Sequence, residues 1–243
     1  MTAWMAGRTA LVTGAGSGIG AAVAEMLASA GASVALYGRG ATALEDIAGR
    51  IRRLGRDALT LPGDVRVCDE LKSAVENTIA RFGALHVFVA NAAIADAGPI
   101  AEADPGLYRD LIETNVLGVL FGIRSALPHM LLRGEGHVIV IASVSGRITY
   151  VGEPAYVASK HAAIAFADCL RQEVAERGIR VSVIEPGLVE TPLIHVYPGA
   201  LDMVPGVVPL DPNDIARAVR FVLEQPPNVN VAEVVLRPTS QIL

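Results

Sequence analysis

A glycine-rich stretch, placed between an apolar run and a helix-prone run, constrains the fold of this chain more than any other feature. Thr9 to Thr13 has the apolar character of a short buried strand, and Gly14-Ala15-Gly16-Ser17-Gly18-Ile19-Gly20 follows it directly. Residues 21–30 then favour a helix. Glycines let the backbone turn sharply and let a phosphate approach the N–H groups at the start of the helix, where the helix dipole favours negative charge. These seven residues therefore predict a nucleotide-binding turn, with a glycine turn that binds no ligand as the alternative.

Strand-like and helix-like segments alternate along the rest of the chain. A length of 243 residues with 52% hydrophobic residues favours one α/β domain over two. The expected further strands are 32–37, 57–61, 86–90, 137–142, 180–185 and 232–237. The expected further helices are 41–55, 67–82, 104–132 with an interruption near Pro128, 154–177 and 212–224, the last with Asp211 as its N-cap.

Charge and composition exclude several classes of partner. The net charge is −5, acidic and basic residues are interspersed and no basic run occurs, which argues against nucleic acid or an anionic membrane surface. Every apolar run is cut by a charge, Gly or Pro before the ~18 residues of a membrane span, and no signal-peptide pattern is visible, so we expect a soluble, cytoplasmic protein. The two cysteines, Cys68 and Cys169, have no metal-site spacing and are expected to be buried thiols, with no metal bound.

Polar residues follow several of the predicted strands. In an open parallel sheet, ligands bind outside the carboxyl ends of the strands. Arg39 stands where the second strand ends and can pair with a 2′-phosphate on an adenosine ribose, or is simply solvated. Asp64-Val65 follows the third strand and can bind adenine, while capping the next helix is a compatible alternative for Asp64. Asn91-Ala92 ends the fourth strand, where small residues leave room for a cofactor and Asn91 can instead tie strands together.

Two further polar residues stand in apolar surroundings. Asn115 lies within the long helical segment among Val116, Leu117 and Val119, so its amide must find partners. It is either purely structural or bends the helix and holds a water. Ser143 lies at the end of the fifth strand, a common position for a turn serine, and gains meaning only from a nearby reactive group.

Tyr156 and Lys160 form the pair with the clearest chemistry. Residues four apart share one face of a helix, so the phenol and the ammonium can point into one cleft. A free phenol titrates near pH ~10, and a cation beside it lowers that pKa. The pair then makes an acid for a carbonyl oxygen or a base for an alcohol, in the range where such catalysis contributes roughly 10²–10⁴-fold. By itself the spacing also occurs by chance on exposed helices.

The last third of the chain adds a turn and a long connection. Pro186-Gly187-Leu188-Val189-Glu190-Thr191 follows the sixth strand and can meet the nicotinamide end of a dinucleotide. Residues 192–210 are mostly apolar, with Asp202 as their only charge, and a loop of this length is usually functional or mobile. We expect this loop to cover an uncharged substrate, or else to pack against the body or another subunit.

Taken together, these residues closely resemble the short-chain dehydrogenase/reductase family over nearly the whole chain. The motifs that carry the resemblance, in the family's order and spacing, are Thr13-Gly14-xxx-Gly18-Ile19-Gly20, Asn91-Ala92-Ala93, Asn115, Ser143, Tyr156-xxx-Lys160 and Pro186-Gly187-xxx-Thr191. The resemblance implies a doubly wound (Rossmann) sheet of about seven parallel strands with helices on both faces. It also implies four catalytic roles: Tyr156 as acid/base, Lys160 lowering its pKa and holding the nicotinamide ribose, Ser143 orienting the carbonyl, and Asn115 holding a relay water.

The cofactor-binding residues expected from the motifs and the strand ends form one set. They are Gly14, Ser17, Gly18, Ile19, Gly20, Arg39, Asp64, Val65, Asn91, Ala92, Tyr156, Lys160, Pro186, Gly187 and Thr191. Two departures stand out: Ala93 replaces the family's usual Gly, and the C-terminal segment resembles a branch of hydroxy-acid, serine and clavulanate-type aldehyde dehydrogenases rather than fatty-acid-synthesis members.

The function expected from this resemblance is hydride transfer between NADP(H) and a small carbonyl or alcohol substrate. NAD-selective relatives have Asp where this chain has Gly38, so no carboxylate repels a 2′-phosphate and NADP is expected over NAD. An NAD-dependent hydroxyl dehydrogenase and a nucleotide-binding regulator without turnover remain the alternatives. Apolar residues on more than one side of the helices around Asn115 and Tyr156 predict a homodimer or homotetramer.

Overall fold

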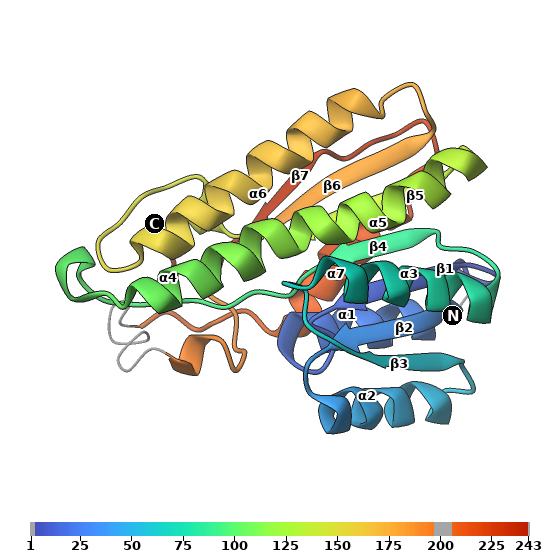
Figure 1. The fold of residues 1–243 in the computed structure, drawn as a ribbon, viewed down its shortest axis with the longest axis horizontal. Coiled ribbons are helices and arrows are strands. Elements are labelled where there is room, and N and C mark those ends of the chain that lie inside the picture. The colour runs from blue at the N-terminus through green and yellow to red at the C-terminus, as the bar shows by residue number, and fades with distance from the viewer. Residues whose placement is uncertain (1–2, 197–205, 243) are drawn as a thin grey trace.

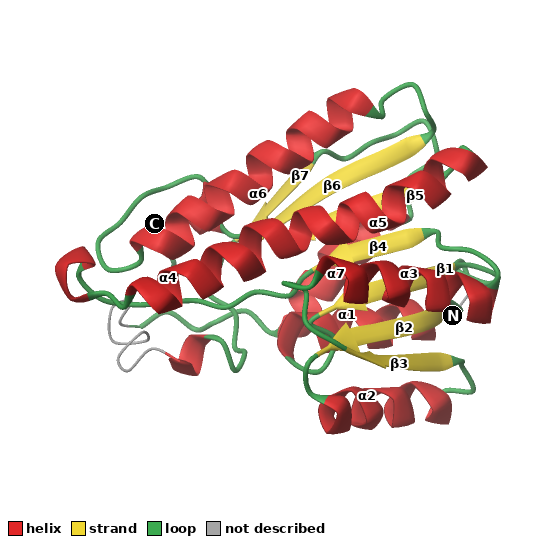
Figure 2. Cartoon of the chain, viewed as in Figure 1, coloured by secondary structure: helices red, strands yellow, loops and turns green. Residues whose placement is uncertain are grey.

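A seven-stranded parallel sheet forms the centre of the computed structural model, which describes residues 3–196 and 206–242 (Figures 1 and 2). The strand order is β3-β2-β1-β4-β5-β6-β7. The strands are β1 Thr9–Thr13, β2 Ser33–Gly38, β3 Ala58–Pro62, β4 Val87–Ala90, β5 Gly136–Ile141, β6 Ile179–Pro186 and β7 Glu233–Leu236. The doubly wound sheet expected from the sequence is confirmed.

Helices cover both faces of the sheet, so its inner strands are apolar on both sides. The α-helices are α1 Gly18–Ser29, α2 Ala41–Arg53, α3 Cys68–Phe82, α4 Pro105–Ile112, α5 Gly118–Arg133, α6 Pro154–Glu173 and α7 Pro212–Leu223. In β1, Val12 packs with buried residues of α1, α2 and α7, while its neighbour Leu11 packs with those of α3, α5 and α6. This alternation follows from the pleat of a strand, which turns successive side chains to opposite faces.

The strand order reverses beside β1, which pairs with β2 on one side and β4 on the other. The connection from β3 to β4 crosses the sheet, so the chain segments that leave β1 and β4 diverge to opposite faces. Ligands of open α/β sheets bind at this position, outside the carboxyl ends of the strands. The fold therefore places the glycine turn after β1 beside the Asn91 turn after β4.

The long helical segment is interrupted earlier than the sequence analysis predicted. A π-helical stretch, Glu113–Leu117, separates α4 from α5, whereas Pro128 lies inside α5 without ending it. The hydrogen bonds of Asn115 to the chain after β4 hold the wider turn in place. Burial of Ala126 and Met130 on both sides of Pro128 keeps α5 continuous there.

The stretch Pro105–Arg133 is long and apolar enough to cross a membrane by length and composition. The apolar-run criterion applied to the sequence did not identify it, because helical charges interrupt it. In the structure its α5 part packs on β4, β5 and α3 through residues that include Val119, Ile123 and Met130. This packing is typical of a core helix.

Three other expectations need correction or confirmation. Cys68 is only partly buried and Cys169 is exposed, so the expectation of two buried thiols is wrong. Cys169 lies off the buried face of α6, which is formed by Ala163, Ala167 and Leu170. Helix α6 ends at Glu173 rather than 177, because the chain turns there toward Gly178, whose φ is 72°. Helix α7 begins as predicted, with Asp211 in a reciprocal capping box with Asp214.

Candidate active site

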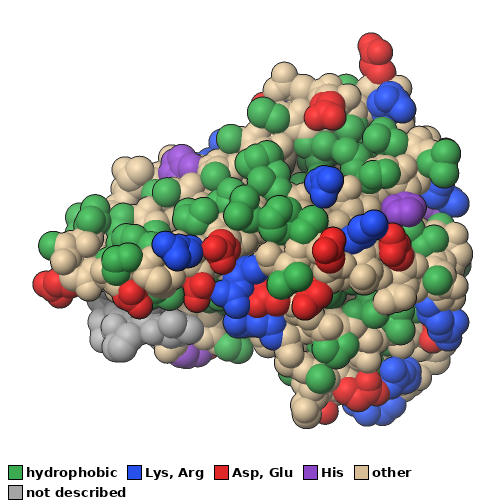
Figure 3. Space-filling model, in the orientation of Figure 1, with side chains coloured by type: hydrophobic (Ala, Val, Ile, Leu, Met, Phe, Trp, Pro, Cys, Tyr) green, Lys and Arg blue, Asp and Glu red, His purple; other side chains and the backbone are tan. Residues whose placement is uncertain are grey.

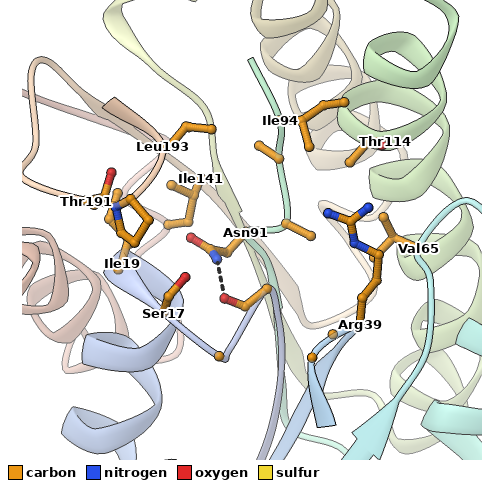
Figure 4. A pocket seen from close by; sticks show the side chains of 18 of the residues that line it. Ser17, Ile19, Arg39, Val65, Asn91, Ile94, Thr114, Ile141, Thr191 and Leu193 are labelled. Carbon is orange, nitrogen blue, oxygen red and sulfur yellow. Dashed lines mark hydrogen bonds between the residues drawn. The ribbon is translucent and has the colours of Figure 1, made fainter. Parts of the chain in front are cut away.

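A cleft of about 420 Å³ opens at the carboxyl ends of β1, β2, β4 and β5 (Figure 4). In this view Asn91 lies in the middle, Ser17 and Thr191 lie to one side, and Arg39 and Val65 lie to the other. Twelve of the expected site residues line the cleft: Gly14, Ser17, Gly18, Ile19, Arg39, Asp64, Val65, Asn91, Ala92, Tyr156, Lys160 and Thr191. The fold thus brings together residues from most of the length of the chain.

Five expected residues do not line this cleft. They are Gly20, Asn115, Ser143, Pro186 and Gly187. Gly20 packs behind the turn, where an added Cβ would collide with the carbonyl oxygen of Gly14. Gly187 donates its N–H to the Leu236 oxygen at 2.7 Å, which extends the β6–β7 pairing past Pro186.

The glycine turn has the geometry that the sequence predicts. Gly14 has φ 65°, a left-handed conformation that L side chains rarely adopt, and a Cβ there would lie 2.8 Å from Asn91 Nδ2. Ser17 precedes α1 in extended conformation, and its side chain makes no capping hydrogen bond. Backbone rather than side chains therefore forms the floor of the cleft at the start of α1.

Asn91 joins the two strands that flank the switch point. Its Nδ2 donates to the backbone oxygens of Thr13 at 2.9 Å and Gly14 at 3.3 Å. The hydroxyl of Thr13 in turn accepts the N–H groups of Asn91 and Ala92 and donates to the Val89 oxygen. The structural role weighed for Asn91 is therefore present, in a residue that also lines the cleft.

The adenosine end of the cleft differs from expectation at Asp64. Asp64 does not cap α3, whose N-cap is Val67 without any side-chain capping bond. Its carboxylate instead accepts from Arg66 at 2.8 Å, and this hydrogen bond lowers the pKa of Asp64. The Arg39 guanidinium is exposed and makes no hydrogen bond or ion pair with any residue that the structure describes. It therefore remains available to an anion at the edge of the cleft.

Asn115 is buried, and its amide is fully engaged with the protein. Oδ1 accepts the Ile94 N–H at 2.8 Å, and Nδ2 donates to the Ile94 oxygen at 2.8 Å and to Ser159 Oγ at 3.1 Å. Ser159 donates to the backbone oxygen of Tyr156 at 2.7 Å. Asn115 thus connects the chain after β4 with the first turns of α6.

Tyr156 and Lys160 share one face of α6, as their spacing predicts. Lys160 Nζ lies 5.5 Å from the centre of the Tyr156 ring and donates to the Ile141 oxygen at 3.1 Å. Burial lowers the pKa of Lys160 to about 8. Burial also raises the pKa of Tyr156, which outweighs the lowering by its hydrogen bond with Ser143. The expected net lowering of the Tyr156 pKa is therefore wrong for this structure, since burial has the larger effect.

Several cleft residues escaped the sequence analysis. Examples are Ala43, Ile94, Thr114 and Ile141. Most are apolar or small and carry no chemical signature, although Ile94 and Thr114 stand near predicted site residues. Among residues 3–196 and 206–242, no group of three His, Cys, Asp or Glu side chains is arranged to hold a metal ion.

Only the ends of the expected substrate loop are described. Leu193 lines the cleft, Ile194 is buried, and a bridge between Val189 and Leu210 closes the base of the loop. Its central residues, including Tyr197, Met203 and Val204, lie outside the described ranges.

The fold, the glycine turn and the Tyr156–Lys160 pair together define the class of protein. Residues 8–198 match the model of the short chain dehydrogenase family, and the chain belongs to that family. It is 39% identical to an uncharacterized oxidoreductase of Staphylococcus saprophyticus over 232 residues, which are 95% of this chain and 97% of that protein. The chain is accordingly an oxidoreductase of this family with a nucleotide-binding fold.

Two solved structures extend the similarity to the level of the fold. A serine dehydrogenase in its closed form, complexed with NADP+, has a TM-score of 0.91 and 29% identity, with 97% of each chain covered. The alcohol dehydrogenase of the archaeon Thermococcus sibiricus, complexed with 5-hydroxy-NADP, has a TM-score of 0.87 and 29% identity over 96% of this chain and 97% of that one.

Proposed function

We propose that this protein transfers a hydride between NADP(H) and the carbon of a small carbonyl or alcohol substrate, with Tyr156 as the general acid/base. The observation that carries the proposal is the placement of Tyr156 and Lys160 in the same cleft as the glycine turn. A nucleotide held by that turn would extend across the cleft toward the pair.

The residues present fit a dinucleotide. Gly14 and Gly18 have left-handed backbone conformations, and a Cβ at Gly14 would lie within 3 Å of both Asn91 and Ala92, so side chains are excluded where phosphates would pass. The start of α1 supplies N–H groups and a positive dipole end. When bound, the cofactor supplies or accepts the hydride at its nicotinamide ring.

The chain's own contribution is control of a proton. Burial raises the pKa of Tyr156, so its phenol holds a proton at neutral pH that can pass to a carbonyl oxygen as reduction proceeds. In the oxidative direction the phenolate must form first. Lys160, whose pKa of about 8 leaves it mostly charged at neutral pH, stabilises that phenolate with its Nζ 5.5 Å from the centre of the Tyr156 ring.

The preference for NADP rests on the end of β2. Gly38 and Arg39 both line the cleft, so the end of β2 itself has a guanidinium and no carboxylate, and that guanidinium makes no ion pair with any described residue. A charge-assisted hydrogen bond from Arg39 to a 2′-phosphate is worth roughly 1.5–3 kcal/mol, about a ten- to hundredfold preference. The NADP+ and 5-hydroxy-NADP complexes of the two solved relatives support this assignment.

Two alternatives make different predictions in one assay. The protein is mixed with NADPH or NADH and a panel of ketones and aldehydes, and separately with NADP+ or NAD+ and a panel of alcohols and hydroxy acids, and the absorbance of the reduced cofactor is followed. NADPH-dependent turnover supports the proposal. Turnover with NAD alone supports a hydroxyl dehydrogenase, and cofactor binding without turnover across the panel supports a regulator.

A further inference from the structure

A hydrogen-bonded chain runs from Ser143 away from the cofactor cleft to a carboxylate. Ser143 Oγ lies 3.1 Å from Ser145 Oγ, Ser145 Oγ lies 2.5 Å from the Tyr150 hydroxyl, and that hydroxyl donates to Glu153 Oε2 at 2.8 Å. Ser143 and Ser145 are buried, and Tyr150 and Glu153 are partly buried. The chain links a hydroxyl that contacts Tyr156 with a group that can change its charge.

Glu153 does not perform the task that its position suggests. It is the N-cap of α6, yet its side chain makes no capping hydrogen bond and contacts Tyr150 instead. The segment after β4 lies against this turn, because Gly98 donates its N–H to the Gly152 oxygen at 2.7 Å. That segment carries Asp96, which is 4% exposed; burial raises the pKa of Asp96, and its hydrogen bond with the Tyr156 backbone offsets only part of this rise. The Glu153 carboxyl is therefore available for the hydrogen bond with Tyr150.

The groups around Glu153 favour its protonated form. Burial raises its pKa most, the hydrogen bond from Tyr150 lowers it, and the nearby carboxylate of Asp96 raises it further. On α6, Tyr156 also faces it and carries a proton at neutral pH. The cation of that helix nearest in sequence, Lys160, lines the cofactor cleft and donates to the Ile141 oxygen.

The protonation state of Glu153 determines which group donates in each of these hydrogen bonds. An ionised carboxylate only accepts, so Tyr150 must give it its single proton. Ser145 must then donate to Tyr150, so it can only accept from Ser143. This contact, at 3.1 Å, is shorter than the other one open to Ser143 Oγ, the Pro186 oxygen at 3.4 Å, and it takes the Ser143 hydrogen away from a reacting oxygen. A protonated Glu153 reverses every bond: Glu153 donates to Tyr150, Tyr150 to Ser145 and Ser145 to Ser143, so that the Ser143 hydrogen is free.

We propose that Ser145, Tyr150 and Glu153 are positioning residues that set the donor direction of Ser143, with the protonation of Glu153 deciding whether Ser143 offers its hydrogen to the substrate oxygen. The inference rests on the proposed function, because it needs a reaction at Tyr156 in which Ser143 takes part. It goes further by assigning roles to three residues that do not line the cofactor cleft.

The test is the pH dependence of carbonyl reduction with a neutral substrate that has no ionisable group. We expect kcat/KM of the wild type to fall by about fivefold over the pH range in which Glu153, whose pKa is raised by burial, loses its proton, since one neutral hydrogen bond is worth about 1 kcal/mol. Tyr150→Phe interrupts the series of hydrogen bonds between Ser143 and Glu153. Its kcat/KM should therefore keep the low-pH value over that range. In Glu153→Gln the fall of kcat/KM with rising pH should also be absent. Tyr108→Phe, the same change at a neighbouring tyrosine outside the chain, should keep it.

The outcomes separate this inference from the proposed function. Absence of NADPH-dependent turnover in the wild type contradicts the proposed function itself. If the wild type turns over without a pH-dependent fall of kcat/KM, or if this fall persists in Tyr150→Phe, only the role proposed for Ser145, Tyr150 and Glu153 is contradicted. A change of KM alone in Tyr150→Phe would instead mark Tyr150 as a wall of the substrate site and also overturn the inference. NADPH binding by fluorescence verifies folding, and if Tyr150→Phe fails to bind, the profile of Glu153→Gln decides.

Discussion

The side-chain amide of Asn115 pairs with both backbone groups of Ile94, each at 2.8 Å. This pair of hydrogen bonds resembles one rung of a β-sheet, formed between a π-helical segment and the residues after β4. Because Ile94 lines the cleft, Asn115 shapes the site without lining it. The same amide reaches α6 through Ser159.

Removing this amide should cost stability. Asn115→Ala leaves the Ile94 N–H and C=O without their partner, and each unsatisfied buried group costs about 1–3 kcal/mol. We expect the free energy of unfolding, measured by urea denaturation, to fall by about 2–4 kcal/mol. Asn77→Ala, at an exposed site on α3, should change it by less than about 0.5 kcal/mol. Equal effects of the two substitutions would show that the pairing contributes nothing.

The loop that carries Ser143 is fixed by a second contact. Arg147, at the end of that loop, donates to the fully buried carboxylate of Glu185 on β6 and to Glu233 on β7. Arg147→Ala would leave Glu185 buried without a cation, and because Arg147 itself is partly exposed we expect a loss of about 1–3 kcal/mol. Arg147→Lys should recover part of this loss. A thermal melt of Arg147→Ala identical to that of the wild type would contradict this account.

His137 should make stability depend on pH. Burial lowers its pKa to about 3 in the folded protein, whereas the unfolded chain binds this proton near pH ~6.5. The contribution of neutral His137 to the free energy of unfolding is therefore complete above pH ~6.5 and is lost as the pH falls toward 3. Between pH 7.5 and pH 5 the wild type should lose about 2 kcal/mol more than His137→Asn does. Parallel losses in the two proteins would show that His137 does not titrate in this way.

Hydrophobic side chains gather on the outer surface of α5 and α6 (Figure 3). Leu107 and Ile112 on α4, Leu117 in the π-helical stretch before α5, and Phe166 on α6 are each more than a third exposed. An apolar surface of this kind usually marks an interface, so we propose a homodimer or homotetramer formed through these helices. Light scattering at micromolar concentration should give a multiple of the 25.3 kDa chain mass, and Phe166→Glu should shift it toward the monomer. A monomer mass for the wild type would contradict the proposal.

Cofactor choice provides a further test at the end of β2. Gly38→Asp combined with Arg39→Ala places a carboxylate where the 2′-phosphate would bind and removes the cation. The ratio of kcat/KM for NADPH to that for NADH should fall from about 10–100 to below one. Because Ser17 offers only a hydroxyl on the other side of this position, the wild-type preference should not be absolute. Equal kcat/KM values for the two cofactors in the wild type would show that Arg39 is only a solvated side chain.

Most of the fold follows from patterns along the chain, since β1, the glycine turn and α1 combine strand periodicity with residues that permit one backbone path. The cleft could be anticipated for the same reason, because parallel strands bring their carboxyl ends together. Two expectations failed for different reasons. Asp64 does not cap α3, because its carboxylate pairs with Arg66, two residues away. Pro128 does not interrupt α5, because tertiary packing keeps the helix intact there. The burial that raises the Tyr156 pKa depends on elements distant in sequence, and the hydrogen bonds from Ser143 to Glu153 depend on the path of the connection between β5 and α6, which the residue pattern does not specify.

The most direct measurement is a comparison of wild type and Tyr156→Phe in NADPH binding and in the rate of carbonyl reduction. The substitution removes one hydroxyl and keeps the ring, so the account predicts nearly unchanged NADPH affinity by fluorescence titration. It predicts a kcat lower by on the order of 10²-fold or more, because the proton donor is lost. Full activity in Tyr156→Phe, with the cofactor bound as in the wild type, would contradict the assignment of Tyr156 as the general acid.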